Sequence, residues 1–508
     1  MNNQGKIILK NSTMLYIRMA VTMLVGLYTS RVILYTLGVS DYGIYNVVGG
    51  LTTMFMFINS SMAVSTSRFL TYELGKGDGG QLSLVYKQAV FIHIIIAIFI
   101  FLLIETLGLW FLYHKMVIPE GRINAAEWTL HTIAVVSVLN VLSTPDISLI
   151  IAHERMSSFA YISLLDVLFK LFIVLTLKYW SGDRLILYAI LLMIAQTVMR
   201  LTYYAYSKRC FKETHGKLFF SKVKFKEMFS FACWNLLGNL ALMTIDQGIN
   251  ILLNLFCGPI VNAARGISSQ LSNYITTFVT NIRMAINPQI TKSFSAGNLV
   301  YMHTLIKYSS LSCYYVLLAI GVPLFCISDY LLSIWLVEVP PYTTIFFRLT
   351  LIYIMANSFA NPIIIGIHST GKIMKFQITE GLLMLLTLPL AWLFLIRGCP
   401  PYWVYVAQTT IAVLSQIGRL YVVLPAINMK WTYYLKSICL PCAFVTIASG
   451  ILPLLIWLYT SKHSTSFLIS ISCLSFIWTI LVLYKIGLKK EEKAFIIRTL
   501  EKFVNRQK

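Results

Sequence analysis

A row of polar side chains, two of them arginines, follows one face of the helix expected at residues 262–286. The row advances in steps of three and four residues, the spacing that keeps side chains on one helix face. Its members are Asn262, Arg265, Ser269, Asn273, Thr276, Thr280, Arg283 and Asn287. Because lipid cannot satisfy such groups along a whole helix, the row lines either a hydrated cavity or a polar contact with another helix.

The two arginines of this row point to an anionic ligand. Arg265 and Arg283 lie 18 residues apart, so they share a face and are separated by about 27 Å of helix. This distance is close to the roughly 30 Å thickness of the hydrocarbon layer of a membrane. A guanidinium group forms forked hydrogen bonds to phosphate oxygens, whereas a cation would be better bound by carboxylates.

Three more ionisable residues lie deep in apolar stretches, where charge is costly and marks a functional candidate. Asp166 precedes Lys170 by four residues, the favourable order for an ion pair on one helix face. The pair either neutralises itself as a structural contact or lines a pathway. Asp246 lies in the apolar stretch 228–253.

Several other charges lie within a few turns of expected helix ends, which favours snorkelling of the side chain to the membrane surface. They are Arg18, Arg31, Arg200, Arg348 and Arg419. Asp146 follows Pro145 and is expected to cap a helix break, and Glu380 lies near the inner end of its span.

Apolar stretches long enough to cross a bilayer recur along the whole chain, about fourteen times at roughly 20 residues each. Apolar residues make up 58% of the 508 and charged residues 12%, and the mean hydropathy is +0.75. The fold class expected is therefore an all-α polytopic membrane protein. The expected spans are 13–36, 44–66, 88–112, 128–151, 157–177, 183–206, 228–253, 262–286, 306–327, 343–365, 374–396, 402–424, 433–459 and 466–486.

The net charge of +22 is best explained by orientation in the membrane. Basic residues concentrate in the segment 206–227 and in the tail after Tyr484, which the positive-inside rule places in the cytoplasm. With an even number of spans, both termini are expected inside, and the acidic link 328–342 is expected outside. The basic residues do not gather on one soluble face, so no nucleic-acid partner is expected.

The chain contains a weak internal repeat. Residues 38–46 (GVSDYGIYN) follow the first span and residues 258–266 (GPIVNAARG) follow the seventh, 220 residues later. Six spans separate the copies, so the halves cross the membrane in the same sense, related by a pseudo-two-fold axis along the membrane normal. Chance similarity between membrane helices is the alternative. The predicted divisions are 1–214 and 215–430, two six-helix bundles, and 431–508, two further spans with a basic tail.

No pattern of catalytic, metal-binding or cofactor-binding residues is expected. The glycine-rich stretch 75–80 joins two membrane spans instead of a strand and a helix, so it is interpreted as a turn. The C-x-x-C of Cys439 and Cys442 lies in a span without a second ligand pair. Neither a P-loop nor a zinc-type histidine motif occurs.

The two six-span halves, the stretch 258–266 with Asn287-Pro288-Gln289-Ile290 beyond it, and the entry 38–46 resemble bacterial polysaccharide biosynthesis flippases. These belong to the multidrug/oligosaccharidyl-lipid/polysaccharide exporter superfamily. The resemblance implies transport of an undecaprenyl-pyrophosphate-linked oligosaccharide across the bacterial cytoplasmic (inner) membrane by alternating access. It further implies membrane lipids, Na⁺ or H⁺, and polysaccharide assembly proteins as partners.

On this basis, one set of residues is expected to attract the pyrophosphate headgroup: Arg18, Arg31, Arg265, Asn273 and Arg283. A second set is expected to couple the cycle to an ion or to hold the halves in register: Asp166, Lys170 and Asp246. A cation-coupled drug or metabolite antiporter of the same superfamily is the main alternative. A membrane-bound glycan ligase or transferase is another, although such enzymes generally need a larger external loop than this chain has.

Overall fold

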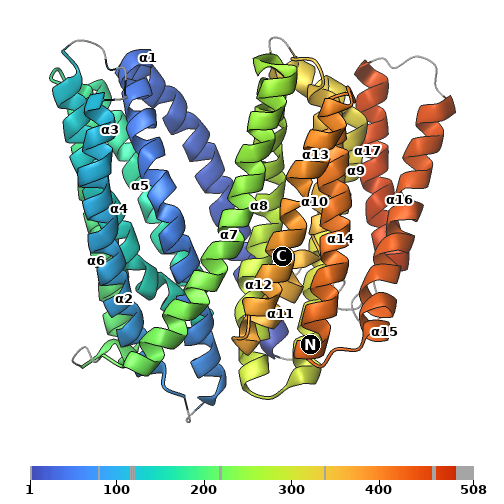
Figure 1. Cartoon of the computed structure of the whole chain (residues 1–508), viewed down its shortest axis with the longest axis horizontal. Helices are drawn as coiled ribbons and strands as arrows, with labels where there is room; N and C mark the ends of the chain where they lie inside the picture. Colours follow the sequence, from blue (N-terminus) through green and yellow to red (C-terminus); the bar gives the residue numbers. More distant parts are fainter. Residues whose placement is uncertain are drawn as a thin grey trace, which may run out of the picture. The chain divides into compact units, whose positions relative to one another are not determined.

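In a computed structural model, the chain folds into long helices (Figure 1). The structure describes residues 3–77, 80–114, 116, 118, 121–216, 220–336, 339–459 and 465–487. Within these ranges all regular secondary structure is helical. Eleven of the described helices are long and apolar enough to cross a membrane. The chain is therefore an all-helical, multi-pass membrane protein, as its composition predicts.

The remaining expected spans lie in two helices that this criterion does not include. Helix α1 (Asn3–Gly75) contains both 13–36 and 44–66, and it bends at Gly38, where φ is +77°. This positive φ is costly for any residue with a Cβ atom, so glycine permits the bend. Helix α8 (Pro259–Ser295) carries the polar row and is too polar to qualify as an apolar helix.

The contacts within the chain define two compact units. The N-terminal unit comprises Ile7–Leu236, and the C-terminal unit comprises Leu237–Ser293 and residues 298–487. The division falls inside α7 (Lys222–Cys257), which begins in the first unit and ends in the second. The boundary at 214/215 expected from the repeat precedes this helix and stays a prediction.

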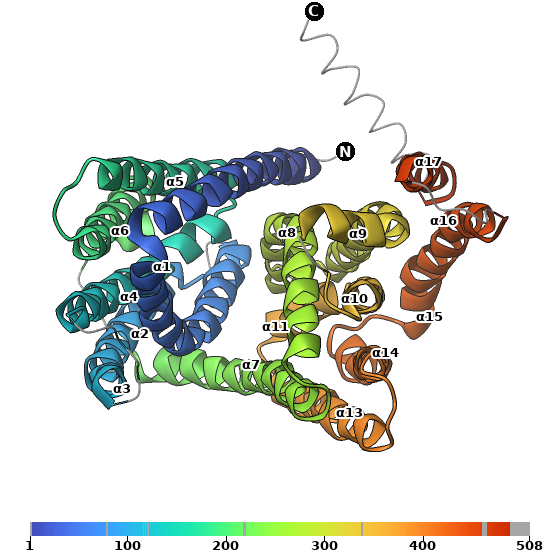
Figure 2. The same cartoon turned by 90° about the horizontal axis from the view of Figure 1, so that it is seen from above.

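In the N-terminal unit, α4 packs between α2 and α6, as the view from above shows (Figure 2). After α1 its helices are α2 (Leu82–Leu103), α3 (Leu109–His114), α4 (Ile123–Ala152), α5 (Met156–Lys178) and α6 (Arg184–Cys210). A π-helical turn, Ile104–Gly108, joins α2 to α3, so the two form one span.

In the C-terminal unit, α14 packs against α10 to α13. After α7 and α8 its helices are α9 (Leu299–Trp335), α10 (Thr343–Asn357), α11 (Ala360–Thr370), α12 (Met374–Leu385), α13 (Thr387–Ile396), α14 (Trp403–Ala426), α15 (Trp431–Tyr434), α16 (Leu440–Tyr459) and α17 (Thr465–Val482). Helices α10 and α11 form one span, as do α12 and α13. The segments around Pro362 and Pro389 interrupt these spans because proline cannot donate the helical hydrogen bond.

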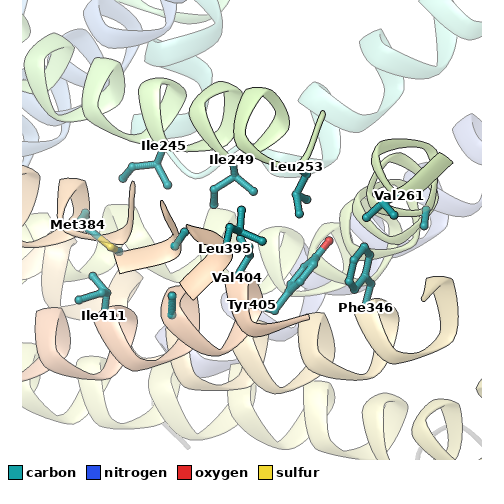
Figure 3. Close-up of a cluster of buried hydrophobic side chains, with 13 residues drawn as sticks. Ile245, Ile249, Leu253, Val261, Phe346, Met384, Leu395, Val404, Tyr405 and Ile411 are labelled. Atoms are coloured by element: carbon teal, nitrogen blue, oxygen red, sulfur yellow. The ribbon is translucent and has the colours of Figure 1, made fainter. Parts of the chain in front are cut away.

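An apolar cluster anchors α7 within the C-terminal unit (Figure 3). Ile245, Ile249 and Leu253 recur at steps of four on one face of α7 and pack against α12, α13 and α14. Gly248 lies on the same side, and a Cβ atom there would come within 2.6 Å of a Leu388 methyl group. Because lipid competes for apolar surface, this close packing is what holds membrane helices together. It also sets the rotation of α7 and hence the direction of its polar residues.

An ion cluster joins the ends of α4 and α6 to the bend of α1. Arg122 donates to Asp41 Oδ2 at 2.5 Å and to Asp183 Oδ2 at 2.6 Å. Asp183 also caps α6, since its Oδ1 accepts from the backbone N–H groups of Leu185 and Ile186. Partial burial acts to raise the pKa of Asp183, but the hydrogen bonds from Arg122 and these N–H groups outweigh it, and the net pKa is below its ordinary value.

This cluster predicts a pH-dependent stability. Because the pKa of Asp183 is lower in the folded protein, its charge stabilises the fold at pH values above the unfolded pKa of about 3.9. This stabilisation is lost as the pH falls through the folded pKa. Asp183→Asn keeps the helix cap and removes the charge. Because the ion pair is partly exposed, this variant is expected to lower the free energy of unfolding by up to about 1 kcal/mol at pH 7. Melting temperatures should differ at pH 7, and the difference should be smaller at pH 3, which lies below the unfolded pKa. An equal difference at both pH values would show that the ion pair does not stabilise the protein.

Candidate functional site

Arg265, on the first half of α8, is held by two residues of α7. Its Nη2 lies 2.5 Å from Asp246 Oδ1 and 3.2 Å from the Asp246 carbonyl oxygen, and its Nε donates to Asn250 Oδ1 at 2.6 Å. Asp246 and Asn250 are four residues apart on α7, so both present their side chains to the same part of α8. They follow Ile245 and Ile249 of the apolar cluster, which sets their direction.

The two partners differ sharply in exposure. Arg265 is only 3% exposed, whereas the Asp246 side chain is 61% exposed. The arginine charge is therefore compensated inside the unit, and the carboxylate is the accessible member of the pair. An anion approaching Arg265 must compete with Asp246, since a buried charge is strongly stabilised by its partner.

Arg283, near the other end of α8, has a different environment. Its Nη2 donates to the carbonyl oxygen of Ser358 at 3.4 Å, and its Nε is buried without a hydrogen-bond partner. Within the described ranges, no carboxylate forms a salt bridge with it. This guanidinium is therefore the uncompensated cation of the polar row.

Further buried polar atoms on α8 and α11 lack a protein partner. Asn287 Oδ1, one turn along α8, is buried without a hydrogen bond. So is Asn361 Oδ1, three residues beyond Ser358. Buried polar groups that no protein atom satisfies are uncommon, because each costs about 1–3 kcal/mol. The unsatisfied oxygen of Asn287, one helical turn from Arg283, favours a place where water or a polar ligand supplies the missing hydrogen bond.

The middle of the polar row is more exposed. Asn273 and Thr280 are exposed, and Thr276 is half-buried. The hydroxyls of Thr276 and Thr280 donate to carbonyl oxygens of their own helix. The Asn273 side chain is thus the exposed amide of the row, and the threonines carry satisfied hydroxyls.

In the N-terminal unit, Asp166 and Lys170 lie on one face of α5. Lys170 Nζ is 2.7 Å from Asp166 Oδ2, and Gln196 of α6 donates to Asp166 Oδ1 at 3.3 Å. The aspartate links two neighbouring helices, while the lysine is largely exposed.

Arg18 lies over an aromatic ring of α5. Its guanidinium carbon is 4.9 Å from the centre of the Phe159 ring, and its Nε is buried without a hydrogen-bond partner. The cation is therefore stabilised by the ring face instead of a carboxylate. The side chain of Arg31 lies outside the described residues.

Two arginine–carboxylate pairs between helices were not expected from the sequence, and the prediction that these arginines snorkel to the membrane surface is wrong. Arg200 of α6 bonds to Asp146 of α4, which also accepts from Tyr86 at 2.8 Å. Arg419 of α14 is 2% exposed and lies 2.5 Å from Glu380 of α12. The two arginines are 219 residues apart, close to the shift of the internal repeat. Each unit thus has an arginine on its sixth span that pairs with a carboxylate of a neighbouring helix. The sequence signal that could have predicted these pairs is the acidic residue within an apolar stretch.

No metal-binding constellation is found in the part of the chain that the structure describes, where no three His, Cys, Asp or Glu side chains group together. The polar row consists of arginines, amides and hydroxyls, and these side chains act through charge and hydrogen bonding. Such a row can bind and release a polar solute within the membrane.

The family model described as "Polysaccharide biosynthesis protein" matches residues 8–294, more than half of the chain. No curated protein matches the chain significantly in sequence.

Solved structures of similar fold are MATE and related transporters. A MATE mutant superposes with a TM-score of 0.71 at 13% identity, covering 84% of this chain and 97% of that one. The outward-facing form of a multidrug resistance MATE family transporter gives 0.68 at 13% identity, with 84% and 97% covered. A MOP superfamily transporter from Pyrococcus furiosus, described by a binding pocket of reverse polarity, gives 0.68 at 13% identity with the same coverage.

At sequence identities this low, the solved structures show the fold alone. The family of the chain is shown by the family model. The expected recognition and fold class are both confirmed. The chain belongs to the polysaccharide biosynthesis protein family, and its fold is similar to those of solved MATE and other MOP superfamily transporters.

Proposed function

We propose that this protein moves an undecaprenyl-pyrophosphate-linked oligosaccharide from the cytoplasmic to the outer leaflet of the bacterial inner membrane by alternating access. The observation that carries the proposal is the polar row of α8, which presents an arginine without a carboxylate partner one helical turn from the buried, unsatisfied amide oxygen of Asn287. The family match supports a role in polysaccharide synthesis.

In this proposal Arg283 binds the pyrophosphate, and the exposed amide of Asn273 contacts the glycan. Arg18, which is stabilised by an aromatic ring within the N-terminal unit, is proposed as a further cation for an anionic headgroup. Such cations favour the anionic cargo because charge-assisted hydrogen bonds to phosphate are the strong ones. The lipid anchor stays in the bilayer throughout.

Arg265 and Asp246 are proposed to couple transport to an ion. While the carboxylate is charged, it holds Arg265. Protonation or Na⁺ binding at the exposed carboxylate weakens this pair and frees the guanidinium for the cargo. A transport cycle driven by H⁺ or Na⁺ follows from this exchange of partners. Asp166 and Lys170 are proposed to hold α5 and α6 in register.

The test uses a bacterial host that lacks its own flippase and displays no surface glycan. The wild-type chain is expected to restore surface glycan. Arg265→Ala is expected to block assembly at normal expression, measured by glycan staining of intact cells.

A double variant tests whether transport needs the guanidinium of Arg265 when Asp246 no longer carries a charge. In Arg265→Gln with Asp246→Asn, both charges are gone and no carboxylate is left unpaired. If Arg265 binds cargo, the double variant fails as well. Full surface glycan in the double variant would remove Arg265 from the headgroup site.

A cation-coupled drug antiporter is the second candidate, and the exposed Asp246 carboxylate is the observation that favours it. In that case expression should raise the resistance of a susceptible host to cationic dyes, and Asp246→Asn should abolish the effect. If expression leaves dye resistance unchanged and restores surface glycan, the protein is a flippase and not a drug antiporter.

A further inference from the structure

A cavity of about 630 Å³ lies in the C-terminal unit, and no residue of the polar row is among the residues that line it. Three helices form its walls, α9, α10 and α16, and its lining is largely apolar. The volume falls within the range of about 300–1,000 Å³ that is common for small-molecule sites. The function proposed above leaves this cavity without a role.

The cavity walls are continuous with the lipid-facing surface of the unit. Phe325, Ile352, Ile447 and Ile451 line the cavity, and each is between 41% and 62% exposed. Exposed apolar side chains on spanning helices face acyl chains, so the occupant can enter directly from the bilayer. The apolar part of a lipid is therefore the matching chemistry.

One end of the cavity carries two opposite charges. Arg348 lines the cavity near the beginning of α10 and bonds to Asp329 near the end of α9, with Nη2 and Oδ2 2.8 Å apart. Its Nε donates to the carbonyl oxygen of Phe325 at 3.2 Å. The Asp329 side chain is 60% exposed, so its carboxylate can accept from a second donor.

The depth of the cavity fits one half of a bilayer. Arg348 and Met355 both line it and are two turns apart on α10, about 10 Å along the helix axis. One leaflet contributes about 15 Å of hydrocarbon. A headgroup at Arg348 therefore places the upper acyl chain beside Met355, Leu318 and Gly450.

We propose that this cavity is a binding site for a phospholipid whose headgroup combines a phosphate with a primary ammonium group. Arg348 binds the phosphate, Asp329 accepts hydrogen bonds from the ammonium, and one acyl chain fills the cavity. Phosphatidylethanolamine has this headgroup. Phosphatidylglycerol lacks the ammonium, and the trimethylated ammonium of phosphatidylcholine has no proton to donate.

The experiment measures lipid binding to the purified full chain by native mass spectrometry. Phosphatidylethanolamine, phosphatidylglycerol and phosphatidylcholine with identical acyl chains are titrated in turn. One phosphatidylethanolamine should bind the wild-type protein roughly tenfold more tightly than the other two lipids, since one charged hydrogen bond distinguishes them.

Three variants test the assigned contacts. Arg348→Gln should weaken the binding of phosphatidylethanolamine about tenfold. Asp329→Asn should remove the preference for it over phosphatidylglycerol. Gly450→Leu should block all three lipids, because a Cβ at Gly450 meets open space and the longer side chain extends into the cavity. Leucine is also the better helix former, so the helix is retained.

Arg397→Gln is the matched control, since Arg397 is an exposed arginine of the same unit that does not line the cavity. It should bind lipid like the wild-type protein. Equal affinity for the three lipids, or unchanged binding in Arg348→Gln and Gly450→Leu, would overturn the proposal. Displacement of phosphatidylethanolamine by an equimolar polyprenyl phosphate would overturn it too, because the cavity would then serve the cargo lipid.

Discussion

Replacing Arg283 by alanine is expected to lower the transport rate of a pyrophosphate-linked glycan at least tenfold, with normal expression and membrane insertion. Arg283 is the arginine of the polar row for which the described residues provide no carboxylate. Its charge is therefore available to cargo without breaking a pair. Loss of one charge-assisted hydrogen bond to phosphate costs about 1.5–3 kcal/mol, which corresponds to roughly ten- to a hundredfold.

Two further variants make this expectation specific. Arg283→Lys keeps the charge and loses the forked geometry, so an intermediate rate is expected. Arg397→Ala removes an exposed arginine elsewhere in the unit and should have no effect. The rate is measured in vesicles containing the purified protein and a fluorescent lipid-linked glycan. Equal rates for Arg283→Ala and the wild-type protein would exclude this residue from the cargo site.

Replacing Glu380 by alanine is expected to destabilise the C-terminal unit by about 3–5 kcal/mol, because it leaves the buried guanidinium of Arg419 without its counter-ion. The result should appear as a large drop in melting temperature and in the yield of folded protein from detergent. Glu227→Gln, which removes a half-exposed partner of Lys224, should cost less than about 1 kcal/mol and serves as the control.

The double variant Glu380→Leu with Arg419→Met tests the mechanism. Replacing both members of a buried ion pair by apolar residues of similar size is often neutral for stability. We therefore expect most of the lost stability to return. A double variant as unstable as Glu380→Ala would show that Arg419 acts through its other contacts, such as the hydrogen bond to Gln416.

The helices could be predicted because their signals are local. Apolar runs of sufficient length and the glycine at position 38 lie within single stretches of sequence, and the structure has helices and a bend there. The polar row of α8 was visible for the same reason, since its spacing belongs to one helix. Local patterns thus determine where helices form and which face of each is polar.

The partners of the charged residues could not be predicted, because they come from other helices. The spacing of α8 is the same whether Arg265 is free or held by Asp246, and only the packing of α7 decides between them. Arg200 and Arg419 lie near helix ends, where snorkelling and burial have the same sequence signature. The neighbouring carboxylates on α4 and α12 are 54 and 39 residues away in the chain.

The lipid cavity shows this limit most clearly. Its walls come from three separate helices, α9, α10 and α16, so no pattern within one helix could predict it. Arg348 was expected near the membrane surface, and its contact with Asp329 and its place on the cavity wall depend on how α9 meets α10. Sites built from several helices need the packed structure.

The most direct test of the central claim compares three cargo lipids in vesicles containing the purified protein. They carry the same glycan and the same anchor, joined by a pyrophosphate, a monophosphate or an uncharged linker. If cationic side chains of the polar row bind the headgroup, the rate should fall in that order, and Arg283→Ala should reduce the pyrophosphate rate to nearly that of the uncharged lipid. Equal rates for all three lipids, or transport of a cationic dye in their place, would contradict the account.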